Sequence, residues 1–342
     1  MTLAPDDPYA AVPVDRFHGV DGRAVRPCTP AEVTRRHLRM LDVRPGARVL
    51  EIGTGSGYSA ALLAHLAGPT GEVTTVDDDP ALAERAAGLF AAYGYRVRVH
   101  LGDGTGGYPD RAPYDRVLAG TTPAAVPDQW LRQLLPGGRM LTGVRLSPLP
   151  GSYAVATLSV DREHRPVDVT VHHGGYTPMT GVAPPGPARA ATAPDEPDHT
   201  LATLAPTGDA PAFLHALRTE PHTEPAPVTG EEYPHWRNWL WGTRPEGLLQ
   251  ATLDQGAGVG VGLCYGASPH VAVLTDSCLV ADRPASPALA VLRSLVDRWR
   301  EEGAPRTHRL SVSLVRRREG WLPRVGAGGS EVAADGGDGG LP

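Results

Sequence analysis

The sequence predicts an α/β fold: a largely parallel sheet with helices on both faces, followed by a smaller α+β domain. Three observations support this prediction. The apolar run 49–52 is typical of a buried strand, because it is short and ends at a glycine-rich turn. An alanine- and leucine-rich helical segment, 59–66, and a second apolar strand, 73–76, come next. Strand-like and helical segments then continue to residue 171, an order typical of a Rossmann-like sheet.

The turn after the first strand carries glycines at alternate positions. Glycine lets a backbone turn tightly and approach a bound molecule, because no Cβ stands in the way. The spacing is G-x-G-x-G, which differs from the G-x-G-x-x-G of dinucleotide-binding turns. The turn supplies five cofactor-binding candidates: Gly53, Thr54, Gly55, Ser56 and Gly57.

Acidic residues next to this turn indicate which ligand it holds. Glu51 stands two residues before the first glycine, where a carboxylate repels phosphate but suits a cationic amino-acid group. Asp77 ends the second strand, where it can accept hydrogen bonds from two ribose hydroxyls, and Asp78 follows it as a further candidate. S-adenosylmethionine has an amino acid, a ribose and no phosphate. We therefore expect it as the cofactor, with S-adenosylhomocysteine as the product.

Later strands of the same sheet end in further candidate residues. Asp103 follows a third strand, where it either reaches the adenine amino group or only closes a turn. Thr121 and Thr122 follow the fourth strand, Tyr114–Gly120. Ligands of open α/β sheets bind outside the carboxyl ends of strands, so both threonines are candidate substrate contacts.

Two further segments of the sequence have features typical of helices. Thr29 and Pro30 precede the segment 31–41 as a candidate N-cap and first helical residue. The segment 127–135 also has a helical pattern.

Composition excludes several classes of function. The net charge is −6 and the pI about 6.1, without a basic stripe, so we expect no nucleic-acid partner. No apolar run reaches membrane-spanning length, and we expect no membrane partner. The three cysteines, Cys28, Cys264 and Cys278, lack metal-ligand spacing, so we expect no metal and a cytoplasmic location.

The sequence changes character after residue 180. Eleven of the 35 prolines lie in 178–227, which predicts a proline-rich linker over 181–229 after a first domain over 1–180. Strand and helix patterns return in a second domain over 230–325, where we interpret three tryptophans as core residues. The strand and helix patterns of this second domain predict a hairpin from 258–265 and 270–275, a helix over 287–300 and a closing strand over 310–315. The glycine-rich tail, 326–342, is expected to be disordered.

Three stretches resemble the protein-L-isoaspartate O-methyltransferase family. They are V-R-P-G-A-R-V-L-E-I-G-T-G-S-G-Y-S-A-A-L-L-A, G-D-G-T-G-G-Y-P-D-R-A-P-Y-D-R-V and L-L-P-G-G-R-M, and they fall in the family's order within residues 12–180. The middle stretch is the most specific, because generic methyltransferases share the glycine turn without it. The resemblance implies a class I S-adenosylmethionine-dependent methyltransferase sheet. It also implies that Gly104, with Asp103 and Asp77, contacts the cofactor.

One motif departs from the family. The family places S-Q-P, with a substrate-side hydroxyl, before the first helix, where this chain has Cys28, Thr29 and Pro30. Matching the prolines sets Cys28 against the serine. Counting back from Glu51 without a gap sets Thr29 there instead. Both residues therefore remain candidates for the substrate side of the site.

The extension after the first domain is similar to that of actinobacterial relatives that mature ribosomally made peptides. There an ordinary aspartate is methylated and the ester closes to an aspartimide. The resemblance implies a dedicated precursor peptide as substrate, with protein-L-isoaspartate repair as the alternative. Either way the partner is a peptide or protein bearing aspartate or isoaspartate. Its carboxylate is ionised at neutral pH and is itself the nucleophile, so the sequence need not supply a general base.

Overall fold

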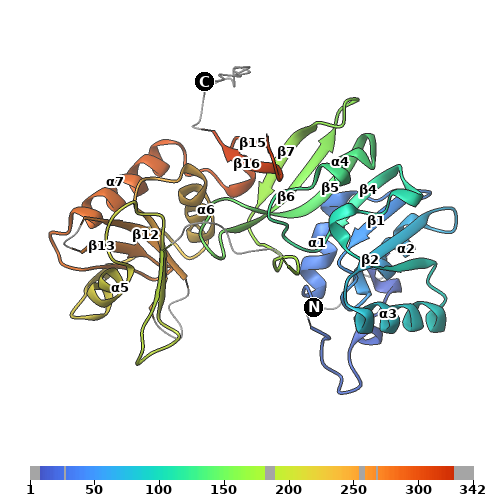
Figure 1. The fold of residues 1–342 in the computed structure, drawn as a ribbon, viewed down its shortest axis with the longest axis horizontal. Coiled ribbons are helices and arrows are strands. Elements are labelled where there is room, and N and C mark those ends of the chain that lie inside the picture. Colours follow the sequence, from blue (N-terminus) through green and yellow to red (C-terminus); the bar gives the residue numbers. More distant parts are fainter. Residues whose placement is uncertain (1–7, 27, 182–188, 254–258, 267–268, 327–342) are drawn as a thin grey trace, which may run out of the picture.

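The first lobe is built on a seven-stranded mixed sheet (Figure 1). The computed structural model describes residues 8–26, 28–181, 189–253, 259–266 and 269–326. The strand order is β3-β2-β1-β4-β5-β6-β7, in which β1 to β5 are parallel and β6 and β7 antiparallel. The strands are β1 (Arg48–Ile52), β2 (Glu72–Asp77), β3 (Val97–Leu101), β4 (Tyr114–Ala119), β5 (Leu134–Arg145), β6 (Tyr153–Val160) and β7 (Pro166–His172). The predicted α/β sheet is confirmed.

Helices lie on both faces of this sheet. They are α1 (Ala31–Leu41), α2 (Tyr58–Ala67), α3 (Pro80–Tyr93) and α4 (Asp128–Arg132). Leu62 of α2 and Phe90 of α3 share a buried cluster with Val49 of β1, and α1 contributes to the same face. On the other face, Trp130 of α4 is fully buried against Val117 of β4. None of the helices formed by the described residues is long and apolar enough to cross a membrane.

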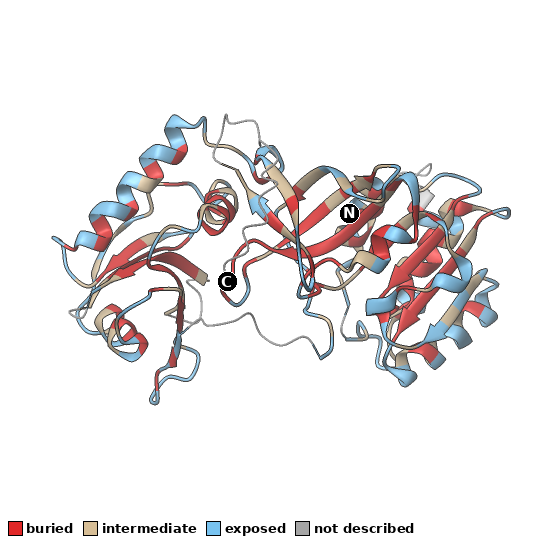
Figure 2. Ribbon diagram, turned by 45° about the horizontal axis from the view of Figure 1, so that its top comes forward, coloured by how far each residue is buried: buried red, intermediate tan, exposed pale blue. Residues whose placement is uncertain are grey.

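The second lobe is a seven-stranded antiparallel sheet in the order β10-β14-β13-β12-β11-β9-β8. Its strands are β8 (Arg189–Thr192), β9 (Thr200–Thr203), β10 (His222–Pro225), β11 (Leu248–Thr252), β12 (Val259–Tyr265), β13 (His270–Leu274) and β14 (Cys278–Ala281). Helix α5 (Ala210–Arg218) packs on one face, and α6 (Tyr233–Thr243) and α7 (Pro287–Glu301) pack on the other. The predicted hairpin and α7 are confirmed. Figure 2 shows buried strands inside both lobes and exposed outer faces on the helices.

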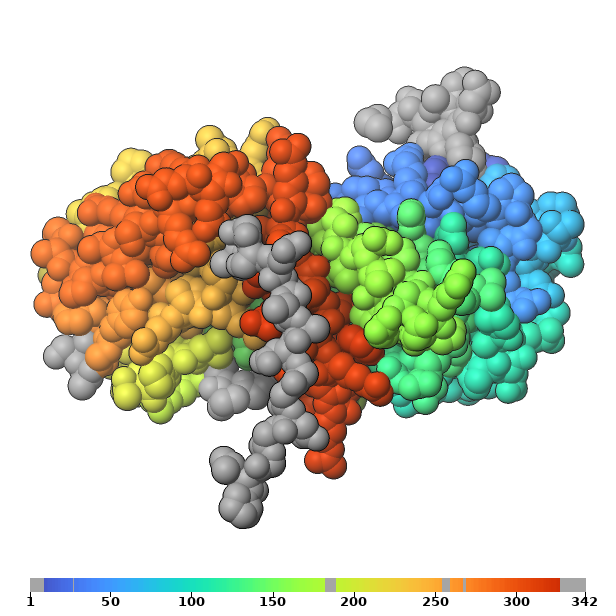
Figure 3. All heavy atoms as spheres, turned by 90° about the horizontal axis from the view of Figure 1, so that it is seen from above, coloured from blue at the N-terminus to red at the C-terminus, as the bar shows by residue number. Residues whose placement is uncertain are grey.

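The two lobes share one hydrophobic cluster. Trp130 of the first sheet's α4 belongs to the same buried cluster as Trp236 and Trp241 of α6 and Trp299 of α7. The three α6 tryptophans are core residues, as expected. The last described residues form a two-stranded hairpin, β15 (Val312–Arg317) with β16 (Gly320–Val325), that lies between the lobes (Figure 3). The described residues of the two lobes are therefore packed together.

The expected linker over 181–229 is wrong for the residues that the structure describes. Residues 189–225 contain three strands of the second sheet and helix α5. The prolines occupy positions that tolerate them: Pro211 lies in the first turn of α5, and Pro225 lies in the edge strand β10. A high density of prolines is therefore not sufficient to predict a linker in this chain.

The predicted bounds of several single elements also need correction. Helix α1 begins at Ala31 with Pro30 at the N-cap, so Thr29 does not cap it. The helix expected over 127–135 is limited to α4, because Leu134 already pairs with Tyr114 in the sheet. The closing strand is the hairpin strand β15. The expected disorder over 326–342 falls, except for Gly326, outside the described residues.

Candidate active site

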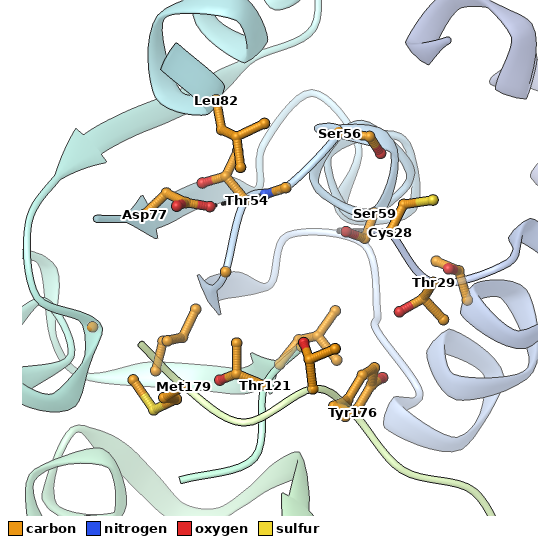
Figure 4. A pocket seen from close by; sticks show the side chains of 18 of the residues that line it. Cys28, Thr29, Thr54, Ser56, Ser59, Asp77, Leu82, Thr121, Tyr176 and Met179 are labelled. Atoms are coloured by element: carbon orange, nitrogen blue, oxygen red, sulfur yellow. Dashed lines mark hydrogen bonds between the residues drawn. The ribbon is translucent and has the colours of Figure 1, made fainter. Parts of the chain in front are cut away.

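A pocket of about 490 Å³ opens at the carboxyl ends of β1, β2 and β4. Its size suits a small-molecule ligand. In Figure 4, Asp77 and Leu82 lie on one side, Cys28 and Thr29 on the other, and Thr121, Tyr176 and Met179 along the lower edge. Residues from the start of α1, the glycine turn and the segment after β7 converge there, although they are far apart in sequence.

The glycine turn forms one wall of the pocket. Four of the five candidate residues of the turn line it: Gly53, Thr54, Gly55 and Ser56. Gly53 and Gly55 have φ angles of 88° and 51°, in the left-handed region that favours glycine. Gly57 does not line the pocket. A Cβ on Gly57 would lie 3.1 Å from the Phe90 ring, so this glycine lets the turn pack against α3.

Asp77 is held in place by backbone groups. Its Oδ2 accepts a 2.9 Å hydrogen bond from the Gly55 N–H, and its Oδ1 accepts a 3.0 Å bond from the Asp79 N–H. A carboxylate has about four acceptor sites, so lone pairs remain for ligand hydroxyls. Asp77 and Asp78 both line the pocket. Asp79 also lines it, while its side chain caps α3.

Glu51 does not line the pocket. It is 1% exposed and lies beneath the turn, where its Oε2 accepts a 2.7 Å hydrogen bond from the Thr75 hydroxyl. Thr75 in turn lies 2.7 Å from the Thr54 hydroxyl. Burial raises the pKa of Glu51 to about 7, and the Asp77 carboxylate acts in the same direction. The expected direct contact with a cationic ligand group is therefore wrong for this structure, and Glu51 is linked to the pocket-lining Thr54 through Thr75.

Asp103 and Gly104 line the pocket next to Asp77. Thr105 donates to Asp103 from both its N–H and its hydroxyl, and these bonds lower the pKa of the carboxyl. The indole N–H of Trp130 donates a 2.8 Å bond to the Gly104 carbonyl. The turn is therefore fixed while the Asp103 side chain stays exposed.

The substrate-side candidates divide into two groups. Cys28, Thr29 and Thr121 line the pocket, and the buried Thr121 hydroxyl oxygen has no hydrogen-bond partner. Thr122 does not line it. Its hydroxyl donates a 2.7 Å bond to the Tyr176 carbonyl, so the expectation of a substrate contact at Thr122 is wrong. Neighbouring residues at a strand end point to opposite sides, which directs only one threonine inward.

The pocket wall includes a segment that sequence reasoning missed. Residues 174–180 follow β7 and cross the carboxyl end of β4. Thr122 holds them through its hydroxyl, its N–H to the Thr177 carbonyl, and its carbonyl to the Met179 N–H. No motif marks this segment, and only the completed sheet brings it to the pocket.

Helix α1 adds two further residues that were not expected. His37 and Arg36 line the pocket, and His37 Nδ1 lies 2.6 Å from the Tyr176 hydroxyl. Burial lowers the pKa of His37 to about 4, with the Arg36 charge acting in the same direction. His37 is therefore neutral at pH 7 and joins α1 to the segment 174–180.

Comparisons with known proteins match the first lobe. A model of the family described as protein-L-isoaspartate(D-aspartate) O-methyltransferase matches residues 28–169. The protein-L-isoaspartate O-methyltransferase of Methanopyrus kandleri is 50% identical over 107 residues, 31% of this chain and 47% of that protein. That of Methanocella arvoryzae is 40% identical over 144 residues, 41% of this chain and 73% of that protein. A solved protein-L-isoaspartate O-methyltransferase covers 94% of this chain and 95% of its own at 16% identity, with a TM-score of 0.46.

The chain spans about half the length of the first curated relatives that it matches, 47%, 51% and 57%. The matched residues 28–169 include the glycine turn and the acidic residues that line the pocket. The relative from Methanocella arvoryzae is covered over nearly three quarters of its length. The chain therefore belongs to the protein-L-isoaspartate O-methyltransferase family.

Proposed function

We propose that this chain is an S-adenosylmethionine-dependent O-methyltransferase that esterifies the carboxyl group of isoaspartyl residues in proteins or peptides. The observation that carries the proposal is one pocket that brings the glycine turn and Asp77 together with the unpartnered Thr121 hydroxyl. Family membership supports the same activity, since the relatives are named for it.

The residues of the pocket fit a cationic, phosphate-free cofactor. Four acids line it, Asp77, Asp78, Asp79 and Asp103, against one arginine, Arg36. Such a set repels phosphate and favours a positively charged ligand. Asp77 would accept from the ribose hydroxyls, and the backbone of the glycine turn would lie along the amino-acid part. When bound, S-adenosylmethionine supplies an electrophilic methyl group.

For the methyl transfer itself, the protein mainly has to position the substrate carboxylate next to the methyl donor. The substrate carboxylate is ionised at neutral pH, so no side chain needs to remove a proton. The hydroxyls of Thr121 and Thr29 would donate hydrogen bonds that orient this carboxylate. Excluding water from the pocket favours charge neutralisation between the carboxylate and the cationic methyl donor. The residues 174–180 contribute by closing one side of the pocket.

A second candidate substrate is an ordinary aspartate in a ribosomally made precursor peptide, with the ester closing to an aspartimide. The packing of the second lobe favours this candidate. That lobe shares a core with the methyltransferase sheet, and its His235 contacts His173, which precedes the pocket-lining Gly174. It could therefore select a peptide, and remote binding energy could orient a poor substrate.

A matched peptide pair tests both candidates. The intact chain is incubated with S-adenosylmethionine and two synthetic peptides that differ only in isoaspartate or aspartate at one position. Mass spectrometry reports the gain of one methyl group or the loss of one water. We expect methylation of the isoaspartyl peptide. Methylation of the aspartyl peptide alone would favour the precursor-peptide substrate, and methylation of neither would contradict the proposed activity.

A further inference from the structure

Imidazole and guanidinium groups gather where the two lobes meet. His172 is the last residue of β7 in the first lobe, and His173 follows it. The His172 ring stacks with His308, their centroids 6.4 Å apart, and the His173 ring meets His235 of α6 edge-on at 5.5 Å. Three arginines stand among these rings. We call this set the junction band: Arg36, His172, His173, His235, Arg237, Arg306 and His308.

The positive charge of the junction band is not neutralised within the described residues. Arg36, Arg237 and Arg306 form no ion pair there. Arg237 lies over the rings of Tyr233 and Trp241, and its buried Nε has no hydrogen-bond partner. The acid that acts on Arg237 is Asp276, which is exposed.

The pKa values of three histidines in the band are lowered, in part by these positive charges. Burial lowers the pKa of His172 to about 4, and His308, Arg36 and His173 add to the effect. The pKa of His173 is lowered by burial, Arg36 and Arg237. That of His235 is lowered by burial, His173, Arg306 and His308. The rings of His172, His173 and His235 are therefore neutral at pH 7, whereas the arginines of the band carry a fixed charge.

The junction band begins at the pocket and leads away from it. Arg36 is exposed and lines the pocket beside Gly174, the residue after His173. Helix α6 and the 3₁₀ turn Thr307–Arg309 carry the band into the second lobe, where that turn contacts both β7 and α6. A peptide whose reacting residue enters the pocket would leave along this surface.

We propose that the junction band binds acidic side chains that flank the reacting residue of a peptide substrate. The proposal rests on the proposed function for its link to catalysis. A guanidinium group pairs with a carboxylate through two parallel hydrogen bonds, which suits the unpaired arginines here. A long nucleic acid fits less well, because the chain carries a net charge of −6 that repels an extended polyanion. Within the described residues no three His, Cys, Asp or Glu side chains group as metal ligands.

Fluorescence anisotropy of labelled peptides tests the proposal with the intact chain. Two peptides carry the same central isoaspartate, flanked by three glutamates in one and three glutamines in the other. We expect the acidic peptide to bind about tenfold more tightly at low salt, since pairing with three arginines at or near the surface contributes roughly twofold each. The preference should disappear at about 1 M NaCl, where charges are screened within a few ångströms.

Two variants and a control locate the effect. Arg306→Gln and Arg36→Gln should each reduce the acidic preference about twofold. Arg162→Gln is the matched control. It removes the same charge from the exposed turn between β6 and β7, at the other end of those strands from His172, and should leave the preference unchanged. An equal loss in all three variants would indicate a net-charge effect and overturn the proposal.

Other outcomes separate this proposal from the proposed function. Equal binding of the two peptides would overturn the band's role, even if both are methylated. Acidic preference without methylation of either peptide would support the band and contradict the methyltransferase activity. Tighter binding of a single-stranded oligoadenylate than of the acidic peptide, sensitive to Arg306→Gln, would assign the band to nucleic acid and overturn the proposal.

Discussion

The backbone N–H of Gly55 donates a 2.9 Å hydrogen bond to Oδ2 of Asp77, which joins the glycine turn after β1 to the end of β2. The second oxygen of Asp77 accepts from the Asp79 N–H at 3.0 Å. One carboxylate therefore sets the shape of two loops that line the pocket. A ligand that pairs with Asp77 meets a site already fixed in position.

Replacing Asp77 with alanine should weaken cofactor binding. The change leaves ligand hydroxyls poorly paired and frees the Gly55 N–H. Each unpaired buried group costs about 1–3 kcal/mol, so we expect an affinity loss of roughly 10- to 100-fold. Isothermal calorimetry with S-adenosylmethionine measures it. Asp110→Ala removes an exposed carboxylate outside the pocket and serves as the control. Unchanged affinity in Asp77→Ala would refute the cofactor assignment.

Glu51 should make the fold less stable as the pH rises. In the unfolded chain Glu51 ionises near pH 4.5, whereas the folded protein holds its proton until about pH 7. The stabilising contribution is complete below pH 4.5 and is lost as the pH rises to 7, a difference of about 3 kcal/mol.

Urea denaturation of the wild type and Glu51→Gln across this range isolates the effect. His37 and His172 titrate in the same range with lowered pKa values, but they are present in both proteins and cancel in the difference. The stability of the wild type relative to the variant should fall between pH 4.5 and 7. A difference that is constant with pH would show that Glu51 is ionised in the folded protein.

Tyr176→Phe should destabilise the pocket wall. The phenol lies 2.6 Å from His37 Nδ1, and both side chains are buried. Losing the phenol leaves a buried ring nitrogen without its partner, at a cost of about 1–3 kcal/mol. Urea denaturation measures the loss, and the double variant with His37→Phe should show much less than the sum of the two single losses. Additive losses would mean that the hydrogen bond does not stabilise the fold.

Thr29→Val should slow methylation of an isoaspartyl peptide more than Cys28→Ala does. Both residues line the pocket, but only Thr29 carries a hydroxyl that can donate to a carboxylate. Loss of one such bond to a charged group corresponds to about a tenfold or larger fall in kcat/KM. Steady-state kinetics of both variants give the order. A larger effect at Cys28 would support the alignment that matches the prolines.

Local sequence patterns were sufficient to predict most of the residues on the cofactor side of the pocket. The order strand, glycine turn, helix and acidic strand end places Gly53, Gly55 and Asp77 by geometry that depends on neighbouring residues alone. Glu51 was misplaced because every residue of β1 after Arg48 is buried. In a strand covered on both faces, burial does not tell which side chains face a ligand.

The substrate half depends on distant parts of the chain. His37 and Tyr176 meet only after β5, β6 and β7 complete the sheet, so no spacing in the sequence predicts their contact. Prolines such as Pro211 and Pro225 suggested a spacer, whereas their places at a helix start and in an edge strand are set by tertiary structure. Local sequence patterns also could not predict the hydrophobic cluster that Trp130 and Trp236 share.

The measurement that tests the central claim most directly is methyl ester formation on an isoaspartyl peptide by the intact chain. S-adenosylmethionine labelled in its methyl group is supplied, and the volatile methanol released by mild base is counted. Carboxyl esters release methanol under these conditions, whereas methyl groups on nitrogen do not. We predict one labelled methanol per isoaspartyl residue, and a large loss in Asp77→Ala. No labelled methanol above the level seen without peptide, or label that stays on the peptide after base treatment, would contradict carboxyl O-methylation by this site.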